Sequence, residues 1–401
     1  MQNEGGQDAD HVEAGGPMTT LQTDRQTKVA CRGLWKVFGP RPERIIGSEH
    51  ADLPRDEMRS ATGCVAAVRD VSFEVARGEI FVVMGLSGSG KSTLIRCLSR
   101  LIEPTAGSVT IDGADVLAMA PQQLRELRRH QVSMVFQHFG LLPNRRVLDN
   151  VAYGLEVRGE SRQSRYARAG ELLDVVGLGG LEQAYPDELS GGMQQRVGLA
   201  RALATEPDVL LFDEPFSALD PLIRRDMQDE VIRLQASMRK TMIFITHDLT
   251  EALKLGDRIA VMRDGDIVQI GTPQDLVAAP ADDYVADFTR DVNRSRILTA
   301  RWIMAPAPAT PSGDSGPTPG GDHAQTPAGD HAPTARGDYW PTSGADDGPT
   351  APADTVVHEL IPLVAADGRP VRILDGDTVI GTVDRAAVMA AVYGEAGNGH
   401  R

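Results

Sequence analysis

The amino-acid sequence predicts an α/β fold with a largely parallel sheet. Strand-like and helix-like segments alternate from about Val29 to Asn293, as expected for strands joined by crossover helices. Near-continuous apolar runs, typical of strands buried on both faces, occur at 132–136, 209–212 and 241–245. The chain has 401 residues, 41% of them hydrophobic, which is enough for a sizeable core and for two or three domains.

Composition changes outside this block. Residues 1–26 are polar and Gly-rich, and we expect them to be disordered. The α/β domain is placed at 27–293, and helical patterns within about 138–200 predict a helical subdomain. Residues 294–356 are dominated by Ala, Pro, Gly, Thr and Asp, a composition typical of a disordered linker.

The end of the chain regains apolar order. Residues 371–374 and 378–383 have the pattern of strands, and 385–390 have the pattern of a helix. We expect a small β-β-α unit here that is too short to form a core of its own.

A glycine-rich loop follows the apolar segment 79–84. Residues 85–92 read Gly-Leu-Ser-Gly-Ser-Gly-Lys-Ser, of the form GxxxxGK[ST], and a helical run follows from Thr93. Backbone N–H groups at a helix start form an anion site, and glycines leave room for a phosphate. Lys91 is expected to reach the β- and γ-phosphates, and the Ser92 hydroxyl to bind Mg²⁺.

A second glycine-rich turn, 189–196, opens a second helix and reads Leu-Ser-Gly-Gly-Met-Gln-Gln-Arg. It repeats the geometry of an anion site, although one nucleotide needs only one cradle for its γ-phosphate. A plain helix N-cap would explain Ser190 but not the two glycines that follow. We therefore expect this turn to cover a nucleotide held by another copy of the chain.

Two carboxylates end the apolar run 209–212. Asp213 is expected to face Mg²⁺ beside Ser92, and Glu214 to polarise the attacking water. A positioned base of this kind is worth roughly 10²–10⁴ in rate. A solvated acidic pair at a strand end is common in general, but the phosphate loop upstream favours the catalytic interpretation.

Three further polar residues follow strand-like runs. Gln137 could complete Mg²⁺ coordination or place a water, although taken alone it is better interpreted as a surface residue. His247 could hydrogen-bond the γ-phosphate, whereas a lone histidine there would usually be structural. Asp220, just before Pro221, could also cap a helix.

These motifs, in this order, resemble the ATP-binding subunits of ABC transporters over roughly residues 29–290. Met193 departs from the glutamine of the commonest signature, but Ser190 and Gly192 are kept. The matching elements are the Walker A loop at 85–92, Gln137 of the Q-loop, the signature at 189–193, Walker B at 209–214, the D-loop at 217–220 and the switch residue His247.

A closer resemblance is to the ATPase subunit of glycine betaine/L-proline importers. Phe38 in the run 34–39 aligns with the adenine-stacking residue of that family, although Trp35 could stack instead or both could be core aromatics. About 25 residues, 40–64, intervene before the strand 68–73, an insertion that this subgroup carries. Other matching segments are 101–105, 147–150, 185–188, 216–223, 228–230 and 256–260.

The resemblance implies an ABC-type P-loop ATPase with a parallel-sheet core, an antiparallel β subdomain and a helical subdomain. It implies ATP and Mg²⁺ as ligands and catalytic roles for Glu214, His247 and Gln137. Mg²⁺ would be held by Ser92, Gln137 and Asp213, and Asp220 would lie at the dimer interface. The implied ATP contacts are Phe38, Gly85, Leu86, Ser87, Gly88, Ser89, Gly90, Lys91, Ser92 and Thr93, with Ser190, Gly191, Gly192 and Met193 contacting the partner's ATP.

The implied partners are a second ATPase subunit, membrane permease subunits and, through the permease, an extracytoplasmic solute-binding protein. The expected location is the cytoplasmic face of the inner membrane, because no apolar run approaches the ~20 residues of a membrane span. The formal net charge of −15 argues against a nucleic-acid partner. Two alternatives remain: the ATPase of another solute importer and a non-transport ABC ATPase.

The tail departs from the resemblance. Relatives often end in a tandem CBS module that senses ionic strength, whereas only residues 357–393 resemble part of one such unit here. A degenerate remnant is the favoured interpretation, and a complete sensing pair is not expected.

Overall fold

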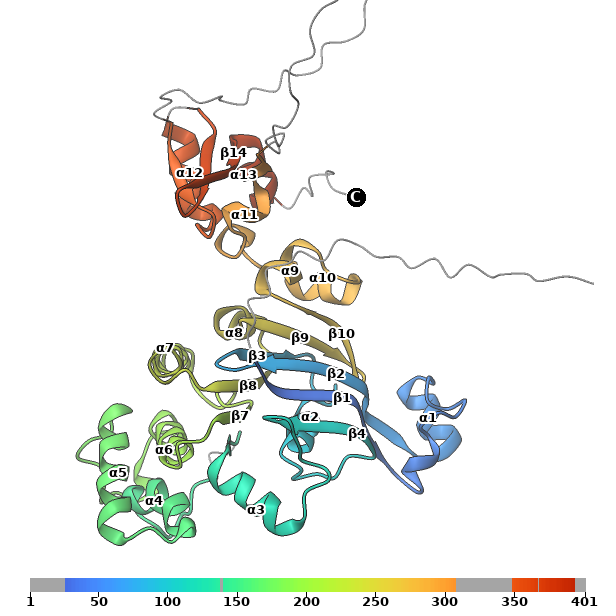
Figure 1. Ribbon diagram of the computed structural model, residues 1–401, viewed down its shortest axis with the longest axis vertical. Helices are drawn as coiled ribbons and strands as arrows, with labels where there is room; N and C mark the ends of the chain where they lie inside the picture. Colours follow the sequence, from blue (N-terminus) through green and yellow to red (C-terminus); the bar gives the residue numbers. More distant parts are fainter. Residues whose placement is uncertain (1–25, 138–139, 308–347, 367, 394–401) are drawn as a thin grey trace, which may run out of the picture.

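The computed structural model describes residues 26–137, 140–307, 348–366 and 368–393. A six-stranded sheet in the order β10-β9-β3-β8-β7-β6 lies at the centre of the molecule (Figure 1). Its strands pair in parallel except for β10, which is antiparallel to β9. The expected parallel sheet is confirmed. The strands are β3 (Ile80–Met84), β6 (Val132–Val135), β7 (Val209–Asp213), β8 (Thr241–Thr246), β9 (Arg258–Arg263) and β10 (Asp266–Gly271).

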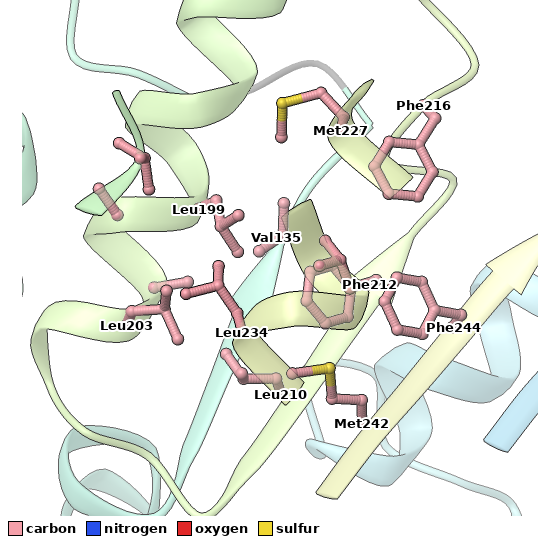
Figure 2. Packing of buried hydrophobic residues seen from close by; sticks show 14 of the residues in the cluster. Val135, Leu199, Leu203, Leu210, Phe212, Phe216, Met227, Leu234, Met242 and Phe244 are labelled. Carbon is pink, nitrogen blue, oxygen red and sulfur yellow. The ribbon is translucent and has the colours of Figure 1, made fainter. Parts of the chain in front are cut away.

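Side chains of the central strands alternate between two cores, because successive residues of a strand point to opposite faces. Leu210 and Phe212 of β7 pack toward α6 and α7, where the Phe212 and Phe244 rings stack with centroids 4.0 Å apart (Figure 2). Val209 and Leu211 belong to the core on the other face, with Ile95 of the helix after the phosphate loop. Burial on both faces explains why these strands are apolar throughout.

Helices cover both faces of this sheet. The helix α2 (Lys91–Leu98) packs into the core shared with the second sheet, and α8 (Leu249–Leu255) packs into the opposite one. The remaining helices of this region are α3 (Pro121–His130), α7 (Pro221–Met238), α9 (Pro273–Ala278) and α10 (Asp283–Thr289). No helix in the described part of the chain is both long enough and apolar enough to span a bilayer.

A second, antiparallel sheet lies beside the first in the order β2-β1-β4-β5. Lys28 of this sheet is 1% exposed and pairs with the carboxylates of Asp112 and Asp208. Asp208 immediately precedes β7, so this cation links the two sheets. The strands are β1 (Thr27–Phe38), β2 (Val65–Ala76), β4 (Ala106–Ile111) and β5 (Ala114–Asp115).

A group of helices lies at one side of the molecule (Figure 1). They are α4 (Val147–Arg158), α5 (Arg162–Val175) and α6 (Gly191–Ala204), with the short η2 (Pro186–Glu188) before α6. The buried side chain of Asn150 accepts a hydrogen bond from Leu142 N at 2.7 Å and donates to Arg145 O at 3.0 Å, which fixes the loop entering α4. Residues 138 and 139 of the predicted helical subdomain lie outside the described residues.

The segment between β1 and β2 is ordered. It contains η1 (Pro42–Arg44) and α1 (Arg55–Thr62). Met58 of α1 is fully buried and packs with Ile45, Cys64 and Val37 in a small separate cluster. This insertion therefore has a fixed position on the antiparallel sheet.

The C-terminal unit is larger than the sequence predicts. Its sheet has the order β11-β14-β13-β12, and β11 lies in the sequence before 308–347. Leu298 and Ala300, which also precede 308–347, are buried in the core of this unit. The β-β-α segment thus does not form a core by itself, as expected, but it belongs to a larger unit that does. Its elements are η3 (Arg294–Arg296), α11 (Ala300–Ile303), β11 (Ala305–Pro306), β12 (Thr350–Pro352), α12 (Val357–Ala366), β13 (Val371–Asp375), β14 (Thr378–Val383) and α13 (Arg385–Tyr393).

The predicted linker 294–356 is thus ordered at both ends, because the small unit needs apolar residues from both to fill its core. The rest of that linker, 308–347, and residues 1–25 of the predicted disordered N-terminus lie outside the described residues.

Replacing Lys28 with Met should lower the free energy of unfolding by about 2–3 kcal/mol. The change keeps the apolar stem but leaves Asp112 and Asp208 without their shared buried cation. Urea denaturation of the two proteins measures the difference. The control is Arg32→Ala, which removes an exposed pair with Glu74 and should cost no more than about 1 kcal/mol. Equal effects of the two changes would contradict the prediction.

Candidate nucleotide-binding site

The register of the parallel strands brings most of the candidate residues to one edge of the central sheet. Met84 of β3 pairs with Thr246 of β8, and Asp213 of β7 pairs with Ile245. The loops that follow these strands therefore start at the same level. Ligands in open α/β sheets bind at the carboxyl ends of the strands, which is where these loops begin.

The phosphate loop has a backbone that only glycine can adopt at two positions. Gly85 has φ +153°, and a Cβ there would lie 2.1 Å from Met262 O. Gly90 has φ +107°, and a Cβ there would lie 1.9 Å from Ala67 O. The loop is thus packed tightly against β2 and β9, and α2 starts directly after Gly90.

Lys91 lies inside this loop. Its side chain is almost fully buried, and Nζ donates hydrogen bonds to Gly85 O at 2.8 Å and Leu86 O at 2.9 Å. Burial lowers the pKa of Lys91, and the nearby carboxylates Glu214 and Asp213 oppose that shift. The ammonium group is therefore held where phosphate oxygens would meet the loop.

Asp213 is buried at the end of β7. Its Oδ2 accepts a hydrogen bond from Arg96 Nη2 at 3.0 Å, while its buried Oδ1 has no hydrogen-bond partner among the described residues. Arg96 lies five residues after Lys91 on α2, and nothing in the sequence marks it as a partner of Asp213. A buried carboxylate oxygen without a partner is costly, so this atom needs a ligand or a water.

Glu214 and His247 face each other across the ends of β7 and β8. The distance from Glu214 Oε2 to His247 Nδ1 is 3.1 Å. Glu214 has φ +47°, a left-handed conformation that is uncommon for a residue with a side chain and that often occurs at functional sites. His247 is 54% exposed, so it is not a satisfied core histidine.

Gln137 joins the same group through a serine. Its Nε2 donates a long hydrogen bond, 3.5 Å, to Ser217 Oγ, and Ser217 Oγ donates to Glu214 O at 3.0 Å. The structure thus brings Gln137 and Glu214 together, with Ser217 of the predicted D-loop between them. Ser217 was not singled out in the sequence as a contact of either residue.

The second glycine-rich turn lies elsewhere, at the start of α6 (Figure 1). Ser190 is exposed and its Oγ accepts a hydrogen bond from Met193 N at 3.4 Å. A Cβ on Gly192 would lie 2.4 Å from Ile223 Cγ2, so this glycine allows α6 to approach α7 closely. Asp220 precedes α7, but its side chain makes no capping hydrogen bond, so the capping role suggested by the sequence is wrong.

The two aromatic candidates differ in exposure. Phe38, at the end of β1, is 44% exposed, with Lys36 Nζ 4.9 Å from its ring centroid. Trp35 instead packs against the cluster that holds the insertion. An exposed ring is available for stacking on a base, whereas a packed ring is not.

Comparisons with known proteins agree with this geometry. A family described as ABC transporter matches residues 68–217. The glycine betaine transport ATP-binding protein OpuAA of Bacillus subtilis (strain 168) is 53% identical over 294 residues, which cover 73% of this chain and 70% of that protein. The chain belongs to the ATP-binding subunits of ABC transporters.

Other relatives of this ABC ATPase have similar names. The glycine betaine/proline betaine transport system ATP-binding protein ProV of Escherichia coli (strain K12) is 50% identical over 286 residues, covering 71% of each protein. A solved dimeric structure of the ATP-binding cassette MJ0796, in a post-hydrolysis state bound to ADP and Pi, is 31% identical with a TM-score of 0.52. It covers 61% of this chain and 98% of that one.

Glu251 is hydrogen-bonded to Thr246, the residue before His247, and is a further buried carboxylate near the site. It is 6% exposed on α8, and Thr246 Oγ1 donates to its Oε2 at 2.9 Å. Burial raises the pKa of Glu251 to about 7, with a contribution from Asp248, while the Thr246 hydrogen bond and Arg224 oppose the shift. One feature of the sequence could have pointed to Glu251: it lies three residues after Asp248, the N-cap of α8, whose side chain accepts a hydrogen bond from Glu251 N.

The stability of the protein should depend on pH through Glu251. The pKa of Glu251 is raised from 4.5 to about 7 in the folded state, so the folded protein favours the protonated carboxyl. The stability that this carboxyl contributes is complete below pH 4.5 and is lost as the pH rises through 7. Glu251→Gln keeps an acceptor for Thr246 but cannot ionise. As the pH increases from 4.5 to 7, the free energy of unfolding of the variant should therefore rise relative to that of the wild type, by at most about 3 kcal/mol.

Thermal or urea unfolding at several pH values between 5 and 8.5 measures this difference. The control is Glu171→Gln, because Glu171 is an exposed partner of Arg168. A difference between Glu251→Gln and the wild type that does not change with pH would contradict the prediction.

Proposed function

We propose that this ABC ATPase energises the import of glycine betaine, proline or a related quaternary-amine solute through a partner permease. The observation that carries the proposal is the set of relatives at about half identity. OpuAA, ProV and GbuA, the last from Listeria monocytogenes serotype 1/2a (strain 10403S), are each named for transport of glycine betaine, alone or with proline betaine or carnitine.

Import of another solute is the second candidate, and one observation favours a particular one. The trimethylamine N-oxide transport system ATP-binding protein TmoW of Ruegeria pomeroyi (strain ATCC 700808 / DSM 15171 / DSS-3) is 54% identical over 272 residues, which cover 80% of that protein. Trimethylamine N-oxide shares a fully substituted, cationic nitrogen with glycine betaine. The solute itself would be bound by other chains of the transporter.

In the proposed assembly, two copies of the chain pair head to tail. ATP would lie between residues 85–93 of one copy and residues 190–193 of the other, with its adenine on Phe38. The proposal is supported by the exposed Ser190 at the start of a long helix, separate from the phosphate loop, and by the exposure of Phe38. It is also supported by the dimeric state of the MJ0796 cassette.

The residues at the sheet edge fit a magnesium ion bound with ATP. Mg²⁺ is commonly held by one or two carboxylates together with phosphate oxygens and waters. Asp213 Oδ1 is a buried carboxylate oxygen that needs a partner, and we assign Ser92 and Gln137 as the neighbouring ligands. When bound, the ion would neutralise charge on the phosphates.

Glu214 is the proposed general base for the attacking water. Its carboxylate is mostly buried, and the His247 ring is within hydrogen-bond distance of Oε2. His247 would hold the carboxylate in place and donate to the γ-phosphate, and Gln137 would orient the water. Asp220 would face the partner copy, which agrees with its exposure and its unused capping position.

The proposed partners are those of an ABC importer, and the relatives' names, which describe transport, support them. They are membrane permease subunits and, through them, an extracytoplasmic solute-binding protein. The chain would then act as a peripheral subunit at the cytoplasmic face of the membrane. Nothing in its charge favours nucleic acid, because the formal net charge is −15.

We also propose that the chain divides into an ABC domain at 27–293 and a C-terminal unit with one CBS-like half. The support is the apolar core that joins Leu298 and Ala300 to Ile373 and Val388 and that meets the ABC domain through Val277 of α9.

Glu214→Gln should retain ATP affinity within about threefold but hydrolyse ATP at least about 100-fold more slowly, because the amide cannot accept the proton of the attacking water. Nucleotide titration and phosphate release measure the two quantities. Glu230→Gln is a control of similar burial, since Glu230 is 14% exposed and Glu214 16%. Hydrolysis by Glu214→Gln at the wild-type rate would exclude Glu214 as the base.

The importer function is tested with the purified complex of this chain and its permease in liposomes. ATP hydrolysis is measured with solute-binding protein that is empty, loaded with glycine betaine or loaded with trimethylamine N-oxide, at low and high salt. We expect stimulation of several-fold by the betaine-loaded protein. Stimulation by trimethylamine N-oxide alone would favour the second candidate, and hydrolysis that no loaded protein changes would contradict both.

A further inference from the structure

The insertion at 40–64 reaches the phosphate loop through one side chain. Arg55, the first residue of α1, donates a hydrogen bond from Nη1 to Gly88 O at 2.7 Å. Met58, one helical turn later, is fully buried in the cluster that holds the insertion on β1 and β2. Because residues three apart lie on neighbouring parts of a helix surface, the burial of Met58 fixes the side of α1 from which Arg55 projects.

Gly88 lies at the exposed tip of the phosphate loop. It has φ +83° and forms the exposed tip of the loop together with Leu86 and Ser87. The N–H of the next residue, Ser89, donates to Leu86 O at 3.2 Å. The peptide between Gly88 and Ser89 is therefore held on its carbonyl side by Arg55 and on its N–H side by the loop itself.

Three other carbonyls of the loop are held as well, those of Gly85, Leu86 and Ser89. Lys91 Nζ contacts Gly85 O and Leu86 O, and Gly265 N, in the turn between β9 and β10, donates to Ser89 O at 3.0 Å. Carbonyl oxygens held by these donors give the loop one fixed shape, in which the N–H groups at the start of α2 can receive an anion. At the exposed tip of the loop, Arg55 supplies the hydrogen bond that holds the Gly88 carbonyl.

Helix stability does not explain an arginine at this position. A cation in the first turn is unfavourable with the helix dipole, and α1 carries the favourable acidic residues Asp56 and Glu57 directly afterwards. A cleft of about 510 Å³ between α1 and the β9–β10 turn leaves the guanidinium group of Arg55 accessible to solvent on one side. Its contact with Gly88 is thus a specific interaction rather than a consequence of tight packing.

We propose that Arg55 is a positioning residue of the phosphate loop, through which the 40–64 insertion strengthens nucleotide binding. Arg55 holds the Gly88 carbonyl outward and so keeps the tip of the loop in the shape that receives phosphates. It also adds a positive charge beside them. The inference concerns ATP binding alone and holds whichever solute the transporter imports.

The test compares Arg55→Ala, Arg55→Lys and Arg59→Ala in the full chain. Arg59 lies on the same helix and is exposed, so its removal gives the same change of charge. We expect Arg55→Ala to raise the Kd for ATP and ADP and the KM for ATP about five- to tenfold, with kcat within about twofold. Arg55→Lys should recover part of the affinity, because an ammonium group can donate to the same carbonyl.

Amide hydrogen exchange without nucleotide gives a second measurement. Exchange of the peptide covering 85–92 should be faster in Arg55→Ala and unchanged in Arg59→Ala, at equal thermal midpoints. The proposal is overturned if Arg55→Ala binds both nucleotides within twofold of the wild type. It is also overturned if Arg59→Ala weakens binding equally, since a general effect of charge would then explain the result.

Discussion

The parallel pairing of β3, β8, β7 and β6 is the constraint on which the site depends. Each of these strands ends at the same edge, so the phosphate loop, the two carboxylates, the glutamine and the histidine meet although they are far apart in sequence. Because the strands are apolar on both faces, the sheet cannot shift without exposing a core. The precision of the polar edge thus comes from the apolar layers on either side of it, where Phe212 stacks on Phe244 directly before Asp213.

The same edge of the sheet contains several locally unfavourable features. Glu214 has a left-handed backbone, Asp213 has a buried oxygen without a partner, and Lys91 is buried. Each of these features is unfavourable, and phosphate, a metal ion or water would supply partners for the polar atoms of Asp213 and Lys91. The site is therefore organised before the ligand binds, which is the condition for electrostatic stabilisation without rearrangement.

Much of the ABC fold could be predicted from the sequence because its signals are local. An apolar strand, a glycine-rich turn and a helix start follow one another at 79–98, and Asp213 directly follows its strand. Contacts between distant segments could not be predicted, such as Arg96 with Asp213, Ser217 with Gln137 and Arg55 with Gly88. The core of the C-terminal unit was missed for the same reason, because part of it comes from before a long polar segment. The roles assigned to the individual site residues and the domain boundaries stay predictions.

That core also has a topological consequence. Residues 308–347 connect β11 to β12, and both strands belong to one sheet, so this segment closes a loop rather than joining two separate bodies. A proteolytic cut within it would leave the two fragments held together by β11 against β14 and by Leu298 and Ala300, which pack into the same core as Ile373 and Val388. Doubling its length would cost only about 0.6 kcal/mol in loop-closure entropy. This segment can therefore vary widely in length and sequence among relatives without separating the unit that it interrupts.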